Sequence, residues 1–448
     1  SSKFRLNLNR SLYVYKINMR SNEVDPELLP LLDDIILQED DLTEEAKNRF
    51  SYHREIFRSF ETYRSNILRN EHLTPAGRHL LFSRLNKQHT ECKKVLNYMT
   101  ENSELCRSLP NIGPLIICGL PRTGSTLLYN LLNCDPNCRA PLYTEMVVES
   151  VPPISRSNLV EQQRRSAALR LVEEQEKKLT TQASDISSFH PSFVIDEDFY
   201  ILYQAGLMVF DRTITGVDQS ECDSWLFDIM NKHFAYDYHE TFLRMLNSVD
   251  APHSHWLLKA YMHNLYLDTL LCHYPHARLI MTHRRLHEVI PSFCSFMWNV
   301  NKMYYDKTDS IVRDATIKRS IRLIDKMIAC IMKFRTEQTQ LSHESQTKIF
   351  DVTYDDLIEQ PIVTVHRLYD CFGLQWSDEF EIAMKQWLHD NPQGKQGHHS
   401  YNLADIGLTR EDMEPRYAHY TKLFLRSSVA DANICNQRSS TSTQLEDV

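Results

Sequence analysis

Residues Pro114–Leu132, PLIICGLPRTGSTLLYNLL, carry the clearest indication of the fold. A short apolar run ends at Cys118, glycines follow at positions 119 and 124, and an apolar pattern at helical spacing then begins. The run is too short for a helix and is bounded by turn residues, which predicts a buried strand. A glycine-bearing loop between a strand and a helix favours phosphate binding, because backbone N–H groups and the helix dipole point at the ligand.

The loop lacks the lysine of the common nucleotide-binding loop. Gly119 and Gly124 satisfy the spacing G-x-x-x-x-G, but Ser125 and Thr126 follow where that loop has lysine and a hydroxyl residue. The cation here is Arg122, and no predicted strand end offers an obvious carboxylate for magnesium. The alternatives are an unusual phosphate ligand, a nucleotide kinase with a degenerate loop, and a structural turn whose hydroxyls cap the helix.

Other apolar runs of the same kind predict the rest of a sheet. They lie near residues 255–261, 277–283 and 347–354. Longer helical patterns occupy residues 157–180, 224–248, 286–304 and 310–340. Short apolar strands that alternate with longer helices predict an α/β fold, a P-loop-like parallel sheet with helices on both faces.

The spacing of apolar and polar residues changes toward both ends of the chain. Residues 1–20 alternate apolar and polar side chains, which favours an extended arm, and residues 25–101 are helical in pattern, with Thr74 as a helix cap. We expect a mostly helical N-terminal region over residues 1–109 that packs on the core, and a catalytic domain over residues 110–425. The polar, serine-rich residues 426–448 predict a disordered tail.

Composition limits the class of partner. The 448 residues carry a formal net charge of −9, so a global basic field for nucleic acid is absent and any anion site is local. The 11 cysteines form no C-x-x-C pair, which favours reduced thiols and a cytoplasmic location. No apolar stretch reaches the length of a membrane span. The chain starts at Ser1 without methionine, which leaves room for an upstream signal or anchor that has been removed.

The hexapeptide Pro121–Thr126, PRTGST, resembles the 5′-phosphosulfate loop of sulfotransferases. The longer GLPRTGSTLLYNLL is closer still to the branch of that family with a Leu-Pro-Arg-Thr-Gly-Ser/Thr-Thr loop. The resemblance implies the donor 3′-phosphoadenosine 5′-phosphosulfate (PAPS) and no metal. It assigns the 5′-phosphosulfate to Arg122, Thr123, Gly124, Ser125 and Thr126.

Two later segments resemble further parts of the family's donor site. In LIMTHRRLHEVIPSF, Arg284 follows a predicted strand and Ser292 comes eight residues later, which is the family's spacing for a 3′-phosphate site. In GKQGHHSYNL, Lys395, His399 and Tyr401 match a loop that folds over the donor in related enzymes. Departures from the family's usual residues at Thr144, Ala260-Tyr261 and Arg285-Leu286 leave open a catalytically inactive nucleotide-binding member of the fold.

The resemblance also supplies candidates for catalysis. Lys259 matches the lysine of the family's strand end, where an ammonium would meet charge that develops on the leaving group. The base that deprotonates the acceptor is Glu145, which we expect at the end of the strand after the loop helix, or His190, or His263. Aromatic residues near His190 favour a small or lipophilic hydroxyl acceptor. The sequence carries no indication of oligomeric state.

Overall fold

The structure, a computed structural model, describes residues 37–105, 109–110, 112–179, 194–209, 232–342, 346–392 and 402–425. From Leu37 onward these residues belong to one compact unit. The arm expected at residues 1–20 and the tail expected at 426–448 lie outside the described residues. So do four candidate site residues, His190, Lys395, His399 and Tyr401.

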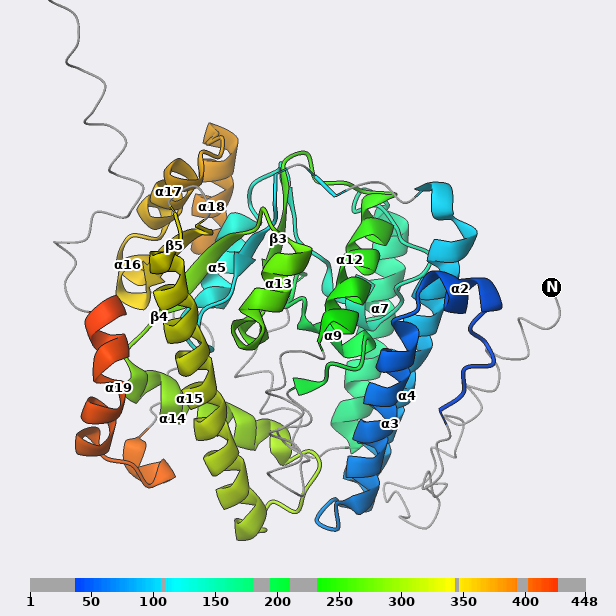
Figure 1. The fold of residues 1–448 in the computed structure, drawn as a ribbon, viewed down its shortest axis with the longest axis horizontal. Helices are drawn as coiled ribbons and strands as arrows, with labels where there is room; N and C mark the ends of the chain where they lie inside the picture. Colours follow the sequence, from blue (N-terminus) through cyan, green and yellow to red (C-terminus); the bar gives the residue numbers. More distant parts are fainter. Residues whose placement is uncertain are drawn as a thin grey trace, which may run out of the picture. The chain divides into compact units, whose positions relative to one another are not determined.

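A five-stranded sheet forms the centre of the unit (Figure 1), and every pair of neighbouring strands is parallel. The strands are β1 Leu115–Ile117, β2 Cys138–Arg139, β3 His255–Lys259, β4 Arg278–His283 and β5 Lys348–Thr353, in the order β2-β3-β1-β4-β5. All residues of β1 and β3 are buried, as expected for strands covered on both faces. The prediction of a parallel α/β sheet is confirmed.

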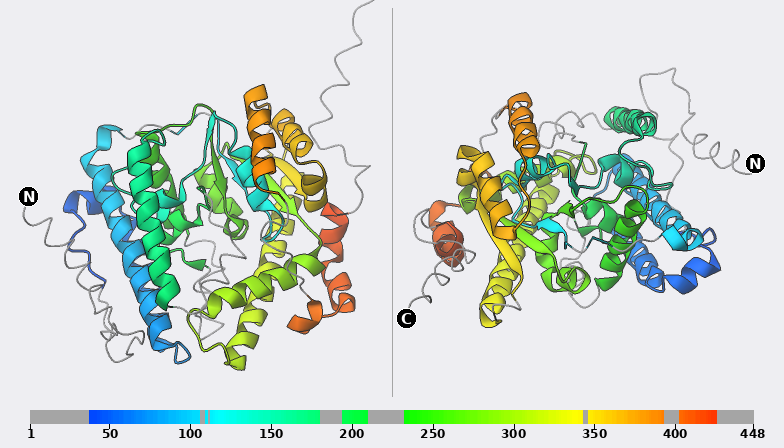
Figure 2. Two further views of the ribbon diagram at one scale, coloured as in Figure 1. Left: turned by 180° about the vertical axis from the view of Figure 1, so that it is seen from behind. Right: turned by 90° about the horizontal axis from the view of Figure 1, so that it is seen from above.

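Helices cover the sheet on both sides (Figures 1 and 2). Helix α5 (Ser125–Leu132) links β1 to β2, whereas α13 (Leu267–His273) links β3 to β4 in the opposite direction along the strand order. Because such crossovers are right-handed, α5 and α13 lie on opposite faces. Between β4 and β5 the chain forms α14 (Leu286–Asn301) and α15 (Ser310–Gln340), and this crossover runs in the same direction as that of α13.

These connections create a switch point between β1 and β4. The two strands are neighbours, yet the loop after β1 leads toward β2 and the loop after β4 leads toward β5, at the other edge of the sheet. Ligands of open α/β sheets bind in the crevice that forms outside the carboxyl ends of strands at such a point. The loop at residues 118–124 and the arginine pair after β4 therefore meet where the topology favours a ligand.

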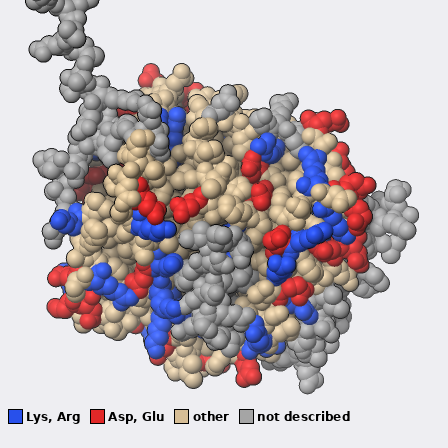
Figure 3. Space-filling model, viewed as in Figure 1, with Lys and Arg blue, Asp and Glu red and all other residues tan. Residues whose placement is uncertain are grey.

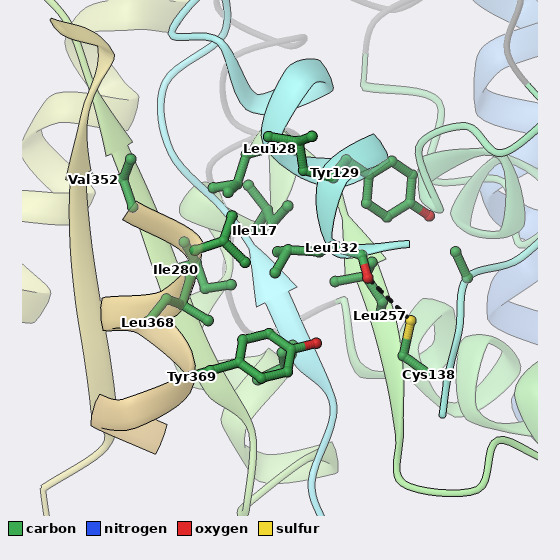
Figure 4. Close-up of a cluster of buried hydrophobic side chains, with 14 of the residues drawn as sticks. Ile117, Leu128, Tyr129, Leu132, Cys138, Leu257, Ile280, Val352, Leu368 and Tyr369 are labelled. Carbon is green, nitrogen blue, oxygen red and sulfur yellow. Dashed lines mark hydrogen bonds between the residues drawn. The ribbon is translucent and has the colours of Figure 1, made fainter. Parts of the chain in front are cut away.

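An apolar core fills the space between the sheet and α5 (Figure 4). Ile117, Leu257 and Ile280 point from three neighbouring strands toward Leu128 and Leu132 of α5. Helix α17 (Pro361–Phe372) adds Leu368 and Tyr369 to the same cluster. Burial of these apolar side chains fixes the position of α5 on the sheet, and with it the position of the loop before the helix.

The N-terminal helices form the other part of the unit, as the helical pattern predicts. They are α2 Glu44–Arg49, α3 His53–Arg69 and α4 Pro75–Glu101, followed by the 3-10 turn Ser103–Leu105. The Thr74 hydroxyl accepts a hydrogen bond from the Gly77 amide (3.0 Å) and Pro75 opens α4, so both end signals are confirmed. Helices α9 (Phe199–Gln204) and α12 (His233–Asn247) pack on this group.

The remaining elements complete the layers. They are α6 Tyr143–Val147, α7 Leu159–Leu179, the 3-10 helix η4 Tyr261–Leu265, α16 Tyr354–Glu359, α18 Asp378–Asp390, the 3-10 helix η6 Leu403–Ile406 and α19 Arg410–Phe424. None of the helices in the described part of the chain is long and apolar enough to cross a membrane.

The cysteines differ from expectation at one position. Seven cysteines of the described segments are free thiols, and burial raises the pKa of the Cys118 and Cys138 thiols, which keeps them protonated and unreactive. Cys371, however, is disulfide-bonded. The expectation of reduced thiols throughout the chain is therefore wrong at this residue.

Candidate active site

The two glycines of the loop between β1 and α5 allow a backbone conformation that other residues would oppose. A Cβ atom at Gly119 would lie 2.1 Å from the Thr282 hydroxyl oxygen and 2.4 Å from the Thr282 backbone nitrogen, so only glycine lets the loop pass β4 this closely. Gly124 has φ +83° and caps α5. Arg122 has φ 64°, an unfavourable value for a residue with a Cβ, and such strain is typical of ligand-binding loops.

The first turn of α5 follows the loop at the carboxyl end of β1 and has backbone amides outside the helical hydrogen-bond ladder. The first hydrogen bond of the helix runs from the Leu128 amide to the Gly124 carbonyl (3.2 Å), so the amides before Leu128 precede the helical ladder. The buried Thr123 hydroxyl instead serves the loop itself. It donates to the Leu120 carbonyl (2.5 Å) and lies 2.6 Å from the Thr282 hydroxyl on β4.

Arg122, Arg284 and Ser292 come together across the switch point, although 170 residues separate the first from the last. The Arg122 Nε donates to the Ser292 hydroxyl on α14 (3.1 Å). The Arg284 guanidinium donates to the Arg122 carbonyl (3.2 Å) and lies over the Tyr354 ring, 4.0 Å from its centroid. The loop after β1 and the loop after β4 thus bring their arginine side chains together at the carboxyl edge of the sheet.

Acidic side chains partly neutralise the positive charge of the arginines that follow β4. Glu288 pairs with Arg284 (2.7 Å) and with Arg285 (2.6 Å), and Arg285 also reaches Asp355 (2.8 Å). Burial opposes ionisation of Glu288, but the hydrogen bonds from Arg285 and Arg284 lower its pKa below the usual range. On the face drawn in Figure 3, basic and acidic side chains are likewise interspersed, in keeping with the absence of a global basic field.

Lys259 lies at the end of β3, next to the start of α5. The register places Lys259 beside Ile117, so its side chain points to the face of the sheet that carries α5. Its Nζ donates to the Thr126 hydroxyl (3.1 Å) and to the Glu197 Oε1 (2.7 Å). Lys259 and Glu197 are both buried, at 2% and 7% exposure, so their charges interact strongly.

A buried hydrogen-bond network around Asp198 holds the end of β3 in place. Asp198 Oδ1 accepts from the Lys259 amide (2.9 Å), and the Asp198 amide donates to the Lys259 carbonyl (3.1 Å). Asp198 Oδ2 lies 2.9 Å from His239 Nε2 and 3.0 Å from His263 Nε2. Burial opposes ionisation of Asp198, but the two histidines hold its pKa well below the usual range.

A known protein family matches the part of the chain that contains the β1 loop, Lys259 and the arginines after β4. The sulfotransferase family model matches residues 114–378, from the residue before β1 to the first residue of α18. The chain belongs to the sulfotransferase family.

Solved structures agree with the fold of this sulfotransferase. Sulfotransferase STF9 from Mycobacterium avium is similar over 87% of this chain and 97% of its own, with 24% identity and a TM-score of 0.71. Sulfotransferase STF1 from Mycobacterium tuberculosis H37Rv is similar over 85% of this chain and 94% of its own, with 22% identity and a TM-score of 0.60. In sequence, no curated protein matches this chain.

Glu145 lies elsewhere in the sulfotransferase than expected. It is the third residue of α6, not the end of a strand, because β2 ends at Arg139. Both carboxylate oxygens are engaged: Oε1 accepts from Arg139 (2.7 Å) and Oε2 accepts from the Leu142 amide (2.9 Å). Burial raises the pKa of Glu145 against the opposing charge of Arg139. These contacts are those of a structural ion pair.

The sheet register places this pair away from Lys259. Arg139 lies beside Trp256 and over its ring, 4.8 Å from the centroid. Trp256 comes three residues before Lys259, so the two side chains point to opposite faces of the sheet, about 10 Å apart along the strand. The partner of Glu145 is therefore on the face opposite α5.

His263 is part of the network around Asp198. It has no exposed surface, its Nε2 faces Asp198, and its Nδ1 lies 2.9 Å from the Tyr236 hydroxyl. An ionised carboxylate only accepts, so His263 donates from Nε2 to Asp198, while its Nδ1 is held by the Tyr236 hydroxyl. With both nitrogens engaged in buried contacts, His263 is placed to orient Asp198 and not to meet a ligand.

Glu197 and Asp198 are the site residues that sequence reasoning missed. They lie in IDEDFY, before α9, as two of three consecutive acidic residues with no motif of their own. Their partner Lys259 is 62 residues from Glu197, and only the folded chain shows the pairing. The run of three acidic residues before an aromatic helix is the one feature of the sequence that could have indicated these two residues. No described group of three or more His, Cys, Asp or Glu residues could hold a metal ion.

Proposed function

We propose that this chain transfers a sulfuryl group from PAPS to a hydroxyl of a small or lipophilic acceptor by in-line displacement. The observation that carries the proposal is the meeting of Arg122, Arg284 and Ser292 with Lys259 and Thr126 at the carboxyl ends of β1, β3 and β4. A donor with a 5′-phosphosulfate and a 3′-phosphate needs two anion sites, and this edge of the sheet supports both.

The 5′-phosphosulfate would bind at the start of α5. The amides of the first turn, the helix dipole and the Arg122 guanidinium favour an anion there. Ser125 and Thr126 add hydroxyls, whereas Thr123 keeps the loop in shape through Leu120 and Thr282. Arg284 and Ser292 would hold the 3′-phosphate, and Glu288 keeps the Arg284 side chain in place.

Lys259 is placed to assist the leaving group. Its ammonium is 3.1 Å from the Thr126 hydroxyl, so it stands beside the anion site at the helix start. A fixed cation there stabilises negative charge that develops on the leaving phosphate oxygen, and a dry site strengthens the effect. We further propose that the loop bearing Lys395, His399 and Tyr401 covers the donor.

An apolar wall beside Glu197 supports a lipophilic acceptor. Phe199 and Tyr200 of α9 follow Glu197 by two and three residues, and their ring centroids are 4.2 Å apart. Tyr143 of α6 contacts the Tyr200 ring at 5.2 Å. All three residues are of intermediate exposure. Half-buried aromatic surface next to a charged pair favours an alcohol carried on an apolar body.

The test is isothermal titration calorimetry with 3′-phosphoadenosine 5′-phosphate, the desulfated donor, in the absence of magnesium. We expect micromolar binding, no comparable binding of ATP, and about 10–100-fold weaker binding by Arg122→Ala, because a charge-assisted hydrogen bond is worth about 1.5–3 kcal/mol. Arg54→Ala, on the exposed side of α3, is the matched control. ATP binding that requires magnesium would instead favour the nucleotide kinase, and binding without turnover an inactive member.

A further inference from the structure

The carboxylate of Glu197 has one engaged oxygen and one without a partner. Oε1 accepts from Lys259 Nζ at 2.7 Å, whereas Oε2 is buried and has no hydrogen-bond partner among the described residues. The side chain is 9% exposed. A buried acceptor left unpaired costs free energy, so such an atom in a candidate active site indicates a place for a donor group from a ligand.

The position of Glu197 fits the acceptor side of the proposed reaction. Lys259 Nζ lies between the Glu197 carboxylate and the Thr126 hydroxyl of the first turn of α5. The Lys259 ammonium is therefore the one group between the carboxylate and the proposed anion site, and the aromatic residues of α9 follow Glu197 directly in the chain. Glu145, by contrast, has both oxygens engaged, and its partner Arg139 lies on the other face of the sheet.

From this geometry we propose that Glu197 is the general base of the proposed sulfuryl transfer, and the inference rests on that proposed function. Glu197 Oε2 accepts the proton of the acceptor hydroxyl while the acceptor oxygen forms a bond to sulfur. The bond between sulfur and the bridging phosphate oxygen breaks, and its electron pair stays on the phosphate, next to Lys259. The products are the sulfate ester, the desulfated donor and a protonated Glu197.

Hydrogen bonds of the neighbouring residues fix the position of the Glu197 backbone. Its own amide donates to Asp196 Oδ1 (2.7 Å), and Asp198 is joined to the Lys259 backbone by two hydrogen bonds. The residue after Glu197 is thus anchored to the end of β3, at the same edge of the sheet that bears the donor loop. A base fixed in this way needs no reorganisation as the proton moves.

The test compares Glu197→Gln with the wild type across hydroxyl acceptors of different acidity, using labelled PAPS. A base matters most for an aliphatic alcohol and least for an acceptor such as 4-nitrophenol that is already ionised at the assay pH. We expect the variant to lose about 10²–10⁴-fold in kcat with alcohols, the usual contribution of a general base, and less than about tenfold with the ionised phenol. Binding of the desulfated donor should stay within about threefold.

Two further variants separate catalysis from structure. Glu197→Asp keeps the carboxylate and should recover part of the activity with alcohols. Glu359→Gln, at an exposed position of α16, controls for the loss of one surface charge. An equal loss for every acceptor would show that Glu197 only positions Lys259, and unchanged activity would exclude any role, so either result overturns the inference. If the wild type binds no desulfated donor and sulfates no acceptor, the proposed function itself fails and the inference with it.

Discussion

Arg139 has no exposed surface and depends on Glu145 for its charge balance. Glu145→Ala would leave the guanidinium with Asp250, at 3.4 Å, as its remaining partner of opposite charge among the described residues. Removal of one partner of a buried ion pair costs about 3–5 kcal/mol. We therefore expect Glu145→Ala to lower the free energy of unfolding by about that amount in urea unfolding. The control Glu359→Ala should change it by less than about 0.5 kcal/mol. A loss below about 1 kcal/mol would contradict the structural role.

Single residues also show where sequence reasoning succeeds. Arg122, Lys259 and Arg284 follow strands whose carboxyl ends share one edge of a parallel sheet, so a correct strand prediction places them together. Glu197 follows no strand, and its distance from Lys259 along the chain hides their pairing. The location of Glu145 was mispredicted because β2 is only two residues long and the chain turns into α6 earlier than the spacing indicates.

At the scale of elements, the contact between the β1 loop and β4 links the stability of the fold to the proposed donor site. In Gly119→Ala the new Cβ would meet backbone atoms of Thr282, so β4 and the loop must separate. Overpacking of this kind costs about 1–3 kcal/mol. It also disturbs the contact between Thr123 and Thr282 that shapes the loop of the proposed anion site. We expect Gly119→Ala to lower the Tm and to abolish calorimetric binding of the desulfated donor.

The matched control is Gly373→Ala, at the end of α17. Gly373 has φ +62°, but a Cβ there would meet no atom within 4 Å. The substitution should cost about 1–2 kcal/mol of backbone strain and leave donor binding intact. Donor binding that stays intact in Gly119→Ala, as in Gly373→Ala, would show that the loop tolerates a side chain at Gly119.

The elements themselves were largely predictable, because their signals are local. Four strands appear in the sequence as short apolar runs, and Thr74 and Pro75 mark the start of α4. The strand order was not predictable, since it depends on which crossovers run toward which edge of the sheet. That order decides that β1 and β4 are neighbours, and it therefore decides that Arg122 and Ser292 meet.

At the scale of the whole molecule, buried histidines link folding to pH. Burial lowers the pKa of His89 and of His255 to about 4, from an ordinary value near 6.5. Between these values the unfolded chain binds protons that the folded chain does not. The free energy of unfolding therefore decreases as the pH falls from about 6.5 toward 4, and it is regained as the pH rises.

His89 offers a direct test, because it packs against two phenylalanine rings. Its ring centroid lies 5.8 Å from that of Phe57 and 5.2 Å from that of Phe60. His89→Phe removes the titrating group and keeps an aromatic ring in the cluster. We expect the Tm of this variant to fall less than that of the wild type between pH 7 and pH 4.5 in a series of thermal scans. His389→Gln, on the exposed side of α18, should follow the wild type. If His89→Phe loses as much Tm as the wild type, protonation of this buried ring does not drive the acid sensitivity of the fold.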